Sequence, residues 1–425
     1  MRVLWFTDLV MPEFARRLGL APPVKGGWMY SLADALNRAG GVRLGIASCF
    51  GHGAVRREEI NGTVHYGIPL QYPGESESDP TPSTIDACQR IVAEFKPDVI
   101  HIFGTEQFFG LLTARGHVRV PCVVWIQGLI HVYERYYFGG LSFRDLLRAH
   151  TLLEITYRRG LLHRKLQWQK RAQLEREIIA GNAHIIGRTL WDRAHVRAVN
   201  PSATYYHCDD LLRPPFYHAE WERAGCRSFS IFSPTAEYPL KGIHWLLRAA
   251  AILKREFPDL IVRIADGKFA DGLRGRTFLA QMKMPGYSRY LGGLVDDLGL
   301  HGVVELTGQL NAEQMAEELA HAHVFVMPSL VENCCNSLCE AALVGTPSVV
   351  SLAGGTTSII DDRRSAIGFP MGDEAMLAEA VRMIFTDDAL AASLSQEARR
   401  AAHARHAEAL ITKRMLEIYQ TLCRG

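Results

Sequence analysis

Two glutamates, Glu332 and Glu340, stand eight positions apart within residues 327–345, MPSLVENCCNSLCEAALVG. An apolar run and a polar loop precede a helix that Asn336 or Ser337 is predicted to cap. The free N–H groups of such a first turn, together with the positive end of the helix dipole, form an anion site. Amide donors beside carboxylate acceptors suit a nucleotide-sugar, whose diphosphate needs donors and whose hydroxyls need acceptors. Taken alone, the two glutamates could also be ordinary acids that flank a helix.

The residues around the two glutamates make the pattern more specific. The motif PS precedes them, NS stands at the helix start, and VGTP, the run SVVS and Gly354-Gly355 follow. This string resembles the donor-binding signature of the retaining glycosyltransferases of family 4, which have the GT-B fold. In that family the first glutamate lies by the donor sugar and the second binds the ribose, which implies these roles for Glu332 and Glu340. The same resemblance implies donor contacts by Asn333, Cys334, Cys335, Asn336, Ser337 and Leu338.

A lysine stands at the start of a second helix, within residues 234–267. This block resembles the family block in which a Lys, usually with an Arg five positions earlier, holds the leaving diphosphate; Lys241 matches, but position 236 is Ala236. Arg188 and Arg213, in segments that resemble bacterial polysaccharide members of the family, are candidate phosphate or acceptor contacts, or else they brace the interdomain linker. Lys241 could also be a solvated lysine, although a cation at a helix N-terminus is unfavourable unless an anion is there.

Two glycine-containing turns are further candidates for donor contacts. Lys25-Gly26-Gly27 precedes the first predicted helix, and glycine lets the backbone approach a phosphate closely. It matches the family's glycine-rich loop between strand one and helix one, with a plain turn as the alternative. The string ELTGQL resembles the family's base-contacting turn, in which Gly308 and Gln309 would meet the nucleobase with backbone groups.

The segment VVWIQGLIH ends a predicted strand of the first half of the chain. Many family members carry a His where this chain has Gln127, at a position that touches the donor sugar. Glutamine carries no charge but can hydrogen-bond a sugar hydroxyl, so Gln127 joins Lys241 and Glu332 in the predicted catalytic set. His131, four positions on, is a candidate substitute, and its alternative is a structural histidine.

Composition indicates a folded protein of two or three domains. The chain has 425 residues, of which 48% are hydrophobic and 22% charged, and a formal net charge of only +2, which argues against nucleic acid as a partner. The start MRVLWFTD predicts a β-strand, no signal peptide is expected, and no apolar run reaches the ~18 residues of a membrane span. Nine scattered cysteines fit reduced thiols and predict a cytoplasmic location. No zinc spacing and no DxD string occurs, so we expect neither metal nor cofactor.

Short Val- and Ile-rich runs alternate with amphipathic helices, which predicts parallel sheets covered on both faces. The pattern predicts an α/β protein of two Rossmann-like parallel-sheet domains facing a cleft, and the resemblance implies that this architecture is the GT-B fold. We expect an acceptor-side domain at 1–218 and a donor domain at 219–404, and the resemblance implies that a helix at 405–425 crosses back to the first domain. Strands are predicted at 3–7, 44–48, 64–67, 99–103, 120–126, 185–188, 205–208, 230–233, 261–265, 303–307, 324–327 and 348–351.

Residues 141–178 form a basic segment that is predicted to be one long helical stretch. It carries nine Lys and Arg against four Asp and Glu, with leucines and a tryptophan interleaved. A basic amphipathic helix suits an anionic membrane surface or a lipid-diphosphate acceptor, and predicts peripheral contact with the inner face of the plasma membrane. The alternative is a solvated helix packed on the domain.

Together these motifs predict a retaining glycosyltransferase that moves a sugar from a nucleotide-sugar to a glycan or lipid-linked acceptor in cell-surface polysaccharide synthesis. The resemblance implies that the leaving phosphate oxygen takes the acceptor proton and that no metal is needed. A nucleotide-sugar epimerase of the same fold would lack the Lys241 and glutamate-pair arrangement. A catalytically silent nucleotide-sugar-binding protein is the other alternative, motivated by Ala236 and Gln127.

Overall fold

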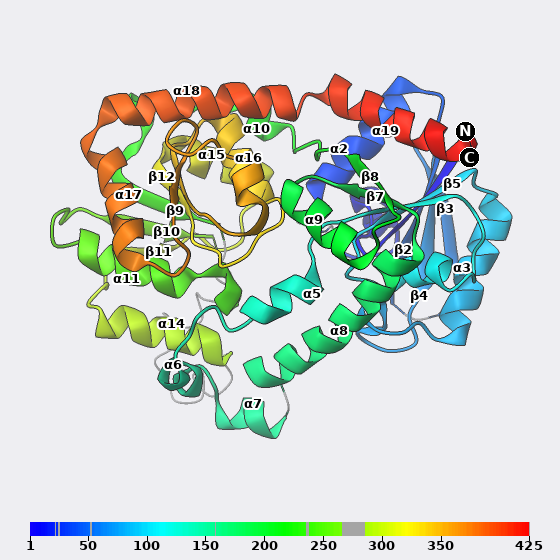
Figure 1. Cartoon of the computed structure of the whole chain (residues 1–425), viewed down its shortest axis with the longest axis horizontal. Coiled ribbons are helices and arrows are strands. Elements are labelled where there is room, and N and C mark those ends of the chain that lie inside the picture. Colours follow the sequence, from blue (N-terminus) through cyan, green and yellow to red (C-terminus); the bar gives the residue numbers. More distant parts are fainter. Residues whose placement is uncertain are drawn as a thin grey trace. The chain divides into compact units, whose positions relative to one another are not determined.

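The computed structural model describes the chain except residues 22, 24, 25, 52, 158, 235–237, 266–284 and 425. The chain divides into two compact units, each built on its own sheet (Figure 1). Unit 1 comprises Met1–Val132, Trp168–Arg213 and His406–Gly425, and unit 2 comprises Tyr133–Gln167 and Pro214–Arg405. The predicted pair of Rossmann-like domains is therefore confirmed.

Unit 1 holds an eight-stranded sheet that is parallel except for its β3–β4 edge pair. Across the sheet the order is β3 (Arg56–Ile60), β4 (Thr63–Pro69), β2 (Arg43–Phe50), β1 (Arg2–Thr7), β5 (Val99–Phe103), β6 (Cys122–Trp125), β7 (His184–Gly187) and β8 (Thr204–His207). Strand β3 is missing from the prediction because four of its five residues are exposed and it has no apolar period. It forms a hairpin with β4 through Asn61 and Gly62, both at positive φ, as short hairpin turns require.

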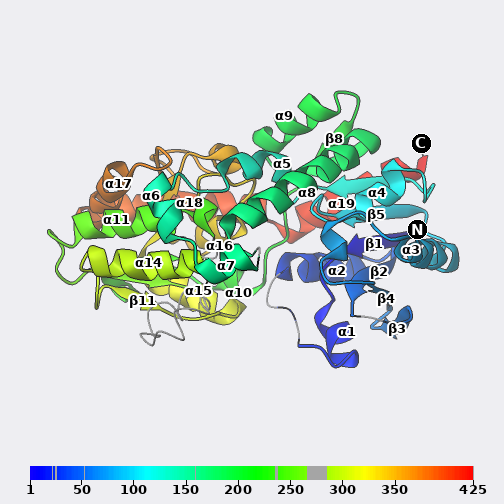
Figure 2. The same cartoon turned by 90° about the horizontal axis from the view of Figure 1, so that it is seen from below.

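Helices cover both faces of this sheet (Figure 2). Leu4 and Phe6 of β1 belong to one core with Ile91 and Phe95 of α3, whereas α2 and α19 contact each other on the opposite face. The helices of unit 1 are α1 (Pro12–Arg17), α2 (Gly27–Ala39), α3 (Pro82–Phe95), α4 (Phe109–Ala114), most of α5 (Ile130–Tyr133), α8 (Leu161–Gly181) from Trp168 on, α9 (Leu190–Val199) and α19 (Glu408–Arg424).

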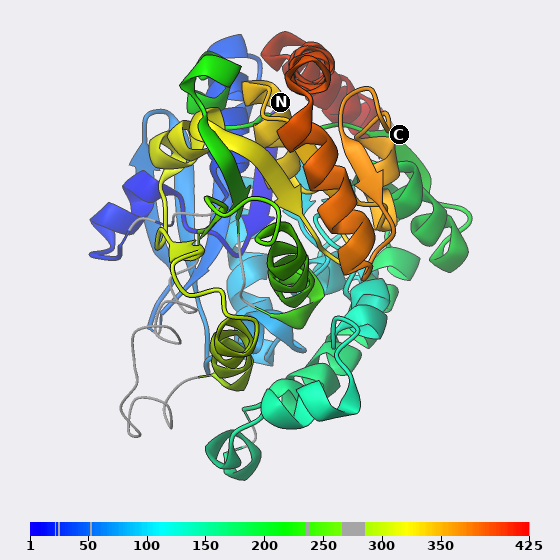
Figure 3. The ribbon, with the colours of Figure 1, turned by 90° about the vertical axis from the view of Figure 1, so that its left-hand side faces the viewer.

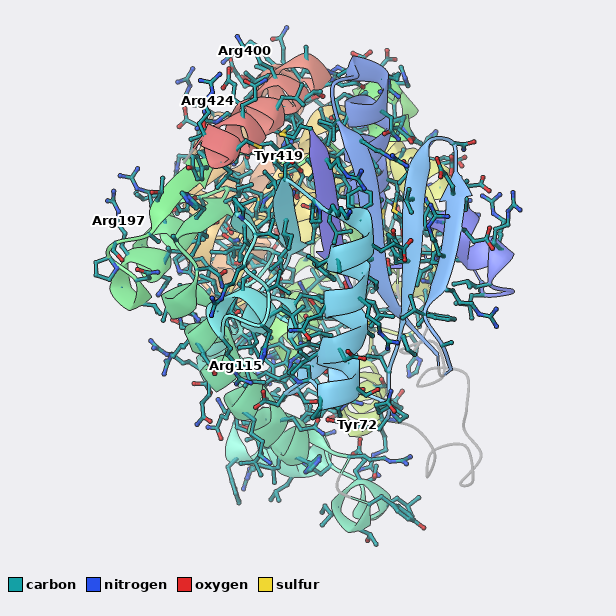
Figure 4. The ribbon with its side chains drawn as sticks, turned by 90° about the vertical axis from the view of Figure 1, so that its right-hand side faces the viewer. Tyr72, Arg115, Arg197, Arg400, Tyr419 and Arg424 are labelled. Atoms are coloured by element: carbon teal, nitrogen blue, oxygen red, sulfur yellow. The ribbon has the colours of Figure 1, made fainter. Side chains whose placement is uncertain are left out.

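The C-terminal helix α19 completes the core of unit 1 through one buried tyrosine (Figure 4). The Trp5 indole N–H donates to the Tyr419 hydroxyl at 3.0 Å, and that hydroxyl lies 2.7 Å from His101 Nδ1. Burial lowers the pKa of His101 to about 3, so the ring is neutral and forms an uncharged hydrogen bond with the Tyr419 hydroxyl. The predicted return of the C-terminal helix to the first domain is therefore confirmed.

Unit 2 holds a six-stranded, wholly parallel sheet. The order is β11 (Val304–Leu306), β10 (Ile261–Ile264), β9 (Arg227–Ser233), β12 (Ala322–Met327), β13 (Ser348–Ser351) and β14 (Ile367–Phe369). Five strands match the prediction; β14 has three residues, too few to show a period. The helices are α6 (Phe143–Arg148), α7 (Leu152–Thr156), α10 (Pro215–His218), α11 (Ile243–Leu253), α14 (Gly286–Asp297), α15 (Ala312–His321), α16 (Asn336–Val344), α17 (Glu374–Thr386) and α18 (Asp388–Arg405).

The expected single helix over 141–178 is wrong, because the segment forms α6, α7 and α8. Thr151 starts a new helix as the N-cap of α7, in a capping box with Glu154, so the chain cannot continue helically from α6. Residues 133–167 also group with unit 2 rather than with the first domain. The Gly139 carbonyl accepts from His244 Nε2 at 2.9 Å and from Trp245 Nε1 at 3.0 Å, which anchors the segment to α11.

Candidate active site

The loop between β12 and α16 carries most of the predicted donor contacts. The N-cap of α16 is Cys335, in extended conformation and without a side-chain cap, so the predicted capping by Asn336 or Ser337 is wrong. These two residues instead form the first turn, because Asn336 is already helical. The N–H groups of Leu338 and Cys339 both point to the Cys335 carbonyl at 3.1 Å. The N–H groups at the start of a helix have no acceptor one turn back, so this first turn keeps the character of an anion site.

The two glutamates occupy different parts of this loop and helix. Glu332 lies in the loop, and Glu340 lies a little over one turn into α16; both side chains are buried. The position of Glu340 in α16 therefore agrees with the predicted position near the first turn. Its buried carboxylate can present oxygen acceptors beside the donors of that turn.

Lys241 reaches the same loop from a tight turn before α11. It ends the 3₁₀ turn Pro239–Lys241, and the next residue, Gly242, has φ +73. A Cβ at Gly242 would collide with the Pro328 carbonyl oxygen, so only glycine allows this close approach. The Leu330 N–H also donates to the Leu240 carbonyl at 2.9 Å. The turn is thus fixed against the loop that carries Glu332.

The consequence is an ion pair between two residues that the sequence singled out separately. Lys241 Nζ lies 2.6 Å from Glu332 Oε1, with side chains 21% and 9% exposed. Burial is the largest single influence on the pKa of Lys241 and lowers it, but the Glu332 carboxylate and the neighbouring groups together raise this pKa above its ordinary value. The Tyr238 ring lies 5.9 Å from Nζ and adds a further contact. The lysine is therefore charged and still partly open to an incoming anion.

The backbone on both sides of this glutamate is held in place. Gly354 has φ +58, and a Cβ there would collide with the Glu332 carbonyl oxygen, which accepts from the Gly355 N–H at 2.8 Å. The Asn333 N–H donates to the Tyr133 hydroxyl at 2.7 Å. Sequence analysis missed Tyr133, because it lies 200 residues away in the chain. These contacts fix the backbone of Glu332 and therefore the position of its Cβ, which preorganises the site.

Three cysteines lie at the end of this loop and the start of α16, and burial keeps two of them, Cys335 and Cys339, as neutral thiols. Cys334 Sγ and Cys339 Sγ lie 3.9 Å apart, and both side chains are buried. Burial raises the pKa of Cys335 to about 12, and the contact with Cys334 together with burial raises the pKa of Cys339. Among the residues that the structure describes, no group of three His, Cys, Asp or Glu side chains is arranged to hold a metal ion.

The predicted base-contacting turn follows the edge strand β11. The Thr307 N–H still bonds to the Ile264 carbonyl at 3.1 Å, and the chain then turns at Gly308 with φ +77. Among the residues that the structure describes, none has an atom within 4 Å of a Cβ built at Gly308, and Gln309 is exposed. The turn lies at the carboxyl end of the strand, where parallel sheets bind ligands, and its backbone is open.

In unit 1 the structure brings the glycine turn and one candidate arginine together. Gly26 is the N-cap of α2 at φ +83, and a Cβ there would collide with the side chain of Leu9. A Cβ at Gly27 would collide with the side-chain stem of Arg213. Arg213 therefore lies over the first turn of α2. Lys25 and Ala236 lie outside the described residues.

Arg188 is placed differently from Arg213. Its guanidinium pairs with the Asp210 carboxylate, and the two side chains are only 2% and 1% exposed. It also donates to the Gln127 carbonyl at 2.9 Å, at the carboxyl end of β6. The His406 Nδ1–H donates to the Asp210 carbonyl at 2.8 Å. This geometry favours the bracing role over a phosphate contact.

His131 is likewise turned into unit 1. Its ring is buried, with Nδ1 2.6 Å from Glu175 Oε2. The Glu175 carboxylate also accepts from the backbone N–H groups of Ile130 and His131 and from Thr105 Oγ1, at 3.0, 2.7 and 2.6 Å. Glu175 thereby fixes the loop after Gln127, which favours the structural alternative for His131. Sequence analysis missed Glu175 because nothing in its local pattern marks a buried acid.

A second acid that sequence analysis missed lies at the carboxyl end of β5. Glu106 Oε1 accepts from the Gly128 N–H at 2.8 Å, next to Gln127. Burial and the neighbouring Glu175 raise the pKa of Glu106 to about 7. A carboxyl group that titrates near neutral pH at a strand end is typical of functional sites.

Residues 218–401 match the family model described as glycosyl transferases group 1. The D-inositol 3-phosphate glycosyltransferase of a Nocardioides species is 32% identical over 175 residues, which cover 38% of this chain and 36% of that protein. Among solved structures, sucrose-phosphate synthase from Thermosynechococcus elongatus has TM-score 0.73 at 19% identity and 99% coverage of both chains. Anabaena HepE in complex with UDP-glucose has TM-score 0.68 at 14% identity, covering 99% and 100%.

These comparisons establish the fold of the whole chain, and they show that residues 218–401 are similar to the glycosyl transferases group 1. At such low identity the structural matches show the fold alone, and that fold is GT-B. The match to the curated relative spans little more than a third of that relative's length. The residues matched by the family model, 218–401, all lie in unit 2.

Proposed function

We propose, since residues 218–401 match the family model of the glycosyl transferases group 1, that this protein transfers a sugar from a nucleotide-sugar to an acceptor hydroxyl and retains the anomeric configuration. The observation that carries the proposal is the ion pair between Lys241 and Glu332, 2.6 Å apart beside the N-terminus of α16. It brings a cation, an acceptor for sugar hydroxyls and helix N–H donors together around one loop. These are the three groups that a nucleotide-sugar needs.

In the proposed complex the nucleotide-sugar separates the ion pair, and each of the two side chains binds a part of the donor instead. The diphosphate takes Lys241 and the N–H groups of Asn336 and Ser337, and Glu332 turns from the lysine to the sugar hydroxyls. Glu340 accepts from the ribose, and the open turn at Gly308 meets the base. Fixed donors aimed at the leaving diphosphate stabilise the charge that develops there, which is the main contribution of the protein to the rate.

The reaction itself needs no protein base. The bond from the anomeric carbon to the phosphate oxygen breaks, the acceptor oxygen bonds to the same face, and the departing phosphate oxygen takes the acceptor proton. Gln127 is proposed to hydrogen-bond the donor sugar, as the family resemblance implies. Arg213, over the glycine turn, is the better candidate for the cation missing at Ala236, because Arg188 is sealed against Asp210.

The proposed acceptor is a glycan or lipid-linked glycan of cell-surface polysaccharide synthesis. The support is the resemblance of residues 187–217 to polysaccharide members of the family. A place at the inner face of the plasma membrane would suit such an acceptor.

The test is a thermal-shift screen of nucleotide-sugars, followed by turnover of every donor that stabilises the protein. Released nucleoside diphosphate and an NMR assignment of the product's anomeric configuration are the readouts. Lys241→Ala should lower turnover by about 10²–10³-fold, and Lys254→Ala, at a partly exposed lysine at the end of α11, is the matched control. Stabilisation without turnover would indicate a silent binding protein, and an isomerised free donor an epimerase. An inverted product would contradict the retaining mechanism.

A further inference from the structure

Three consecutive helical pieces of unit 2 expose large apolar side chains to solvent. Phe143 and Leu147 of α6 stand four residues apart, as do Leu162 and Leu166 at the start of α8, so each pair lies on one helix face. Helices α6 and α7, in teal, lie away from the six-stranded sheet (Figure 3). We call this the α6–α8 surface, whose members are each between 57% and 76% exposed: Phe143, Leu147, Ile155, Tyr157, Leu162 and Leu166.

The charges around this surface have one sign. The two acids of the stretch are not exposed: Asp145 accepts from Arg248 at 3.3 Å, and Glu154 accepts from the Thr151 and Gly286 N–H groups at 3.1 and 2.9 Å. Every charged side chain that is both described and exposed between positions 135 and 170 is a cation: Arg135, Arg144, Arg148, Arg159, Arg164 and Lys170. Asp297 of α14 neutralises one of them, Arg148, at 2.6 Å. The five remaining cations give the α6–α8 surface a net positive charge.

This combination suits a bilayer better than a protein partner. The cores of protein interfaces are depleted in charged residues, whereas here cations alternate with apolar side chains along a short stretch. At a membrane the apolar groups enter the boundary between headgroups and acyl chains, and guanidinium groups meet lipid phosphates. None of the helices in the described part of the chain is long and apolar enough to cross a membrane, so any contact of this surface would be peripheral.

We propose that the α6–α8 surface docks unit 2 on an anionic lipid bilayer. The residues proposed to contact the bilayer are fewer than those of the whole basic segment 141–178, which the sequence predicted to make this contact. Lys165 is engaged in an ion pair with Glu134, and Glu175, farther along α8, is buried in unit 1. Arg158 lies outside the described residues. Docking is therefore carried by the six apolar side chains together with Arg144, Arg159 and Arg164, and it does not depend on which donor or acceptor the enzyme uses.

The first experiment measures co-sedimentation of the full chain with vesicles. Vesicles that contain phosphatidylglycerol should bind the protein at low salt, and vesicles of pure phosphatidylcholine should not. Binding should fall steeply at about 1 M salt, where the Debye length is roughly 3 Å. Failure of the unmodified protein to pellet with anionic vesicles at low salt overturns the proposal.

Two variants separate the contributions of charge and apolar contact. Arg144→Gln, Arg159→Gln and Arg164→Gln together should lower the partition coefficient about a hundredfold, the effect of three cations near an anionic surface. Phe143→Gln, Leu147→Gln, Leu162→Gln and Leu166→Gln should abolish binding. Because all seven side chains are exposed, both variants should keep the melting temperature and the turnover of a soluble donor. The proposed catalytic function is thus tested apart from docking.

A matched control replaces exposed residues elsewhere: Arg90→Gln, Arg400→Gln and Leu410→Gln. It should bind vesicles like the unmodified protein, and an equal loss in this control overturns the proposal. Size-exclusion chromatography adds a second criterion. If the four apolar substitutions convert a dimer into a monomer and leave vesicle binding intact, the surface is an interface between copies of the chain and the lipid proposal falls.

Discussion

Each unit has an ion pair beside the carboxyl ends of its parallel strands, and the two pairs differ in exposure. In unit 2, Lys241 and Glu332 join a tight turn to a loop, and the lysine remains partly open to solvent. In unit 1, Arg188 and Asp210 are sealed, and the arginine also donates to the Gln127 carbonyl. In the sequence all four residues follow strands and could serve a ligand equally well.

Burial separates the roles of the two pairs. A sealed pair has lost its hydration and depends on every internal hydrogen bond, so it holds structure and is not free to change partners. A pair whose lysine is partly exposed can release that partner to an entering ligand. The comparison therefore favours the proposal that Lys241 binds the diphosphate and that Arg188 supports the Gln127 loop.

The largest expected effect is on stability in unit 1. Asp210→Ala leaves the Arg188 charge buried without its carboxylate, which should reduce the free energy of unfolding of unit 1 by about 3–5 kcal/mol. Hydrogen exchange of unit 1 amides measures this locally. Asp388→Ala, which removes an exposed partner of Arg223, is the control and should cost about 1 kcal/mol or less. Equal losses in the two variants would remove the distinction between the pairs.

The next effect is on catalysis in unit 2. Lys241→Ala should lower kcat by about 10²–10³, or ~2.7–4 kcal/mol, because its charge matters most as the diphosphate departs. The donor KM should rise by a smaller factor. Steady-state kinetics with the donor found in the screen gives both numbers. A near-normal kcat would move the role to Arg213.

A smaller effect is expected for nucleotide binding. Glu340→Gln removes a charged acceptor and should weaken binding of the free nucleoside diphosphate by about 1.5–3 kcal/mol. Calorimetry should show the same loss for the nucleotide and for the nucleotide-sugar, since both contain the ribose. Glu313→Gln, at the exposed start of α15, is the control. Unchanged nucleotide affinity in Glu340→Gln would contradict the ribose role.

No effect is expected from metal removal. The chain contains no DxD string, and the leaving diphosphate is assigned to Lys241 and to helix N–H groups. Transfer should therefore continue in EDTA at an unchanged rate. Loss of activity in chelator and its return with magnesium or manganese would show that a metal cation, together with Lys241, stabilises the leaving diphosphate.

The fold was largely predictable because its signals are local. Strands β1 and β12 each contain a run of four apolar residues, VLWF and VFVM, and such runs between amphipathic helices imply parallel sheets. The extent of each unit was not predictable. Residues 133–167 join unit 2 through bonds from Gly139 to His244 and Trp245, more than a hundred positions away, and no local pattern encodes them.

The candidate site was predictable as separate motifs but not as an arrangement. Glu332 and Lys241 were each recognisable from neighbouring residues, whereas their direct pairing depends on the glycine contact at Pro328. The cap at Cys335 differs from the prediction because backbone conformation, and not side-chain preference, decides where α16 begins. The burial of Arg188 depends on Asp210, a partner that the sequence does not mark.

The place of Tyr419 has a consequence for synthesis on the ribosome. Its bonds to Trp5 and His101 span 414 and 318 positions, so the core of unit 1 closes only after the last helix has emerged. Unit 2 needs no residue beyond Arg405 and can finish folding earlier. The nascent chain thus completes its downstream unit first, against the usual order in which N-terminal domains fold first. Until then one face of the eight-stranded sheet lacks helix α19, and chaperones can bind the apolar side chains that this face exposes.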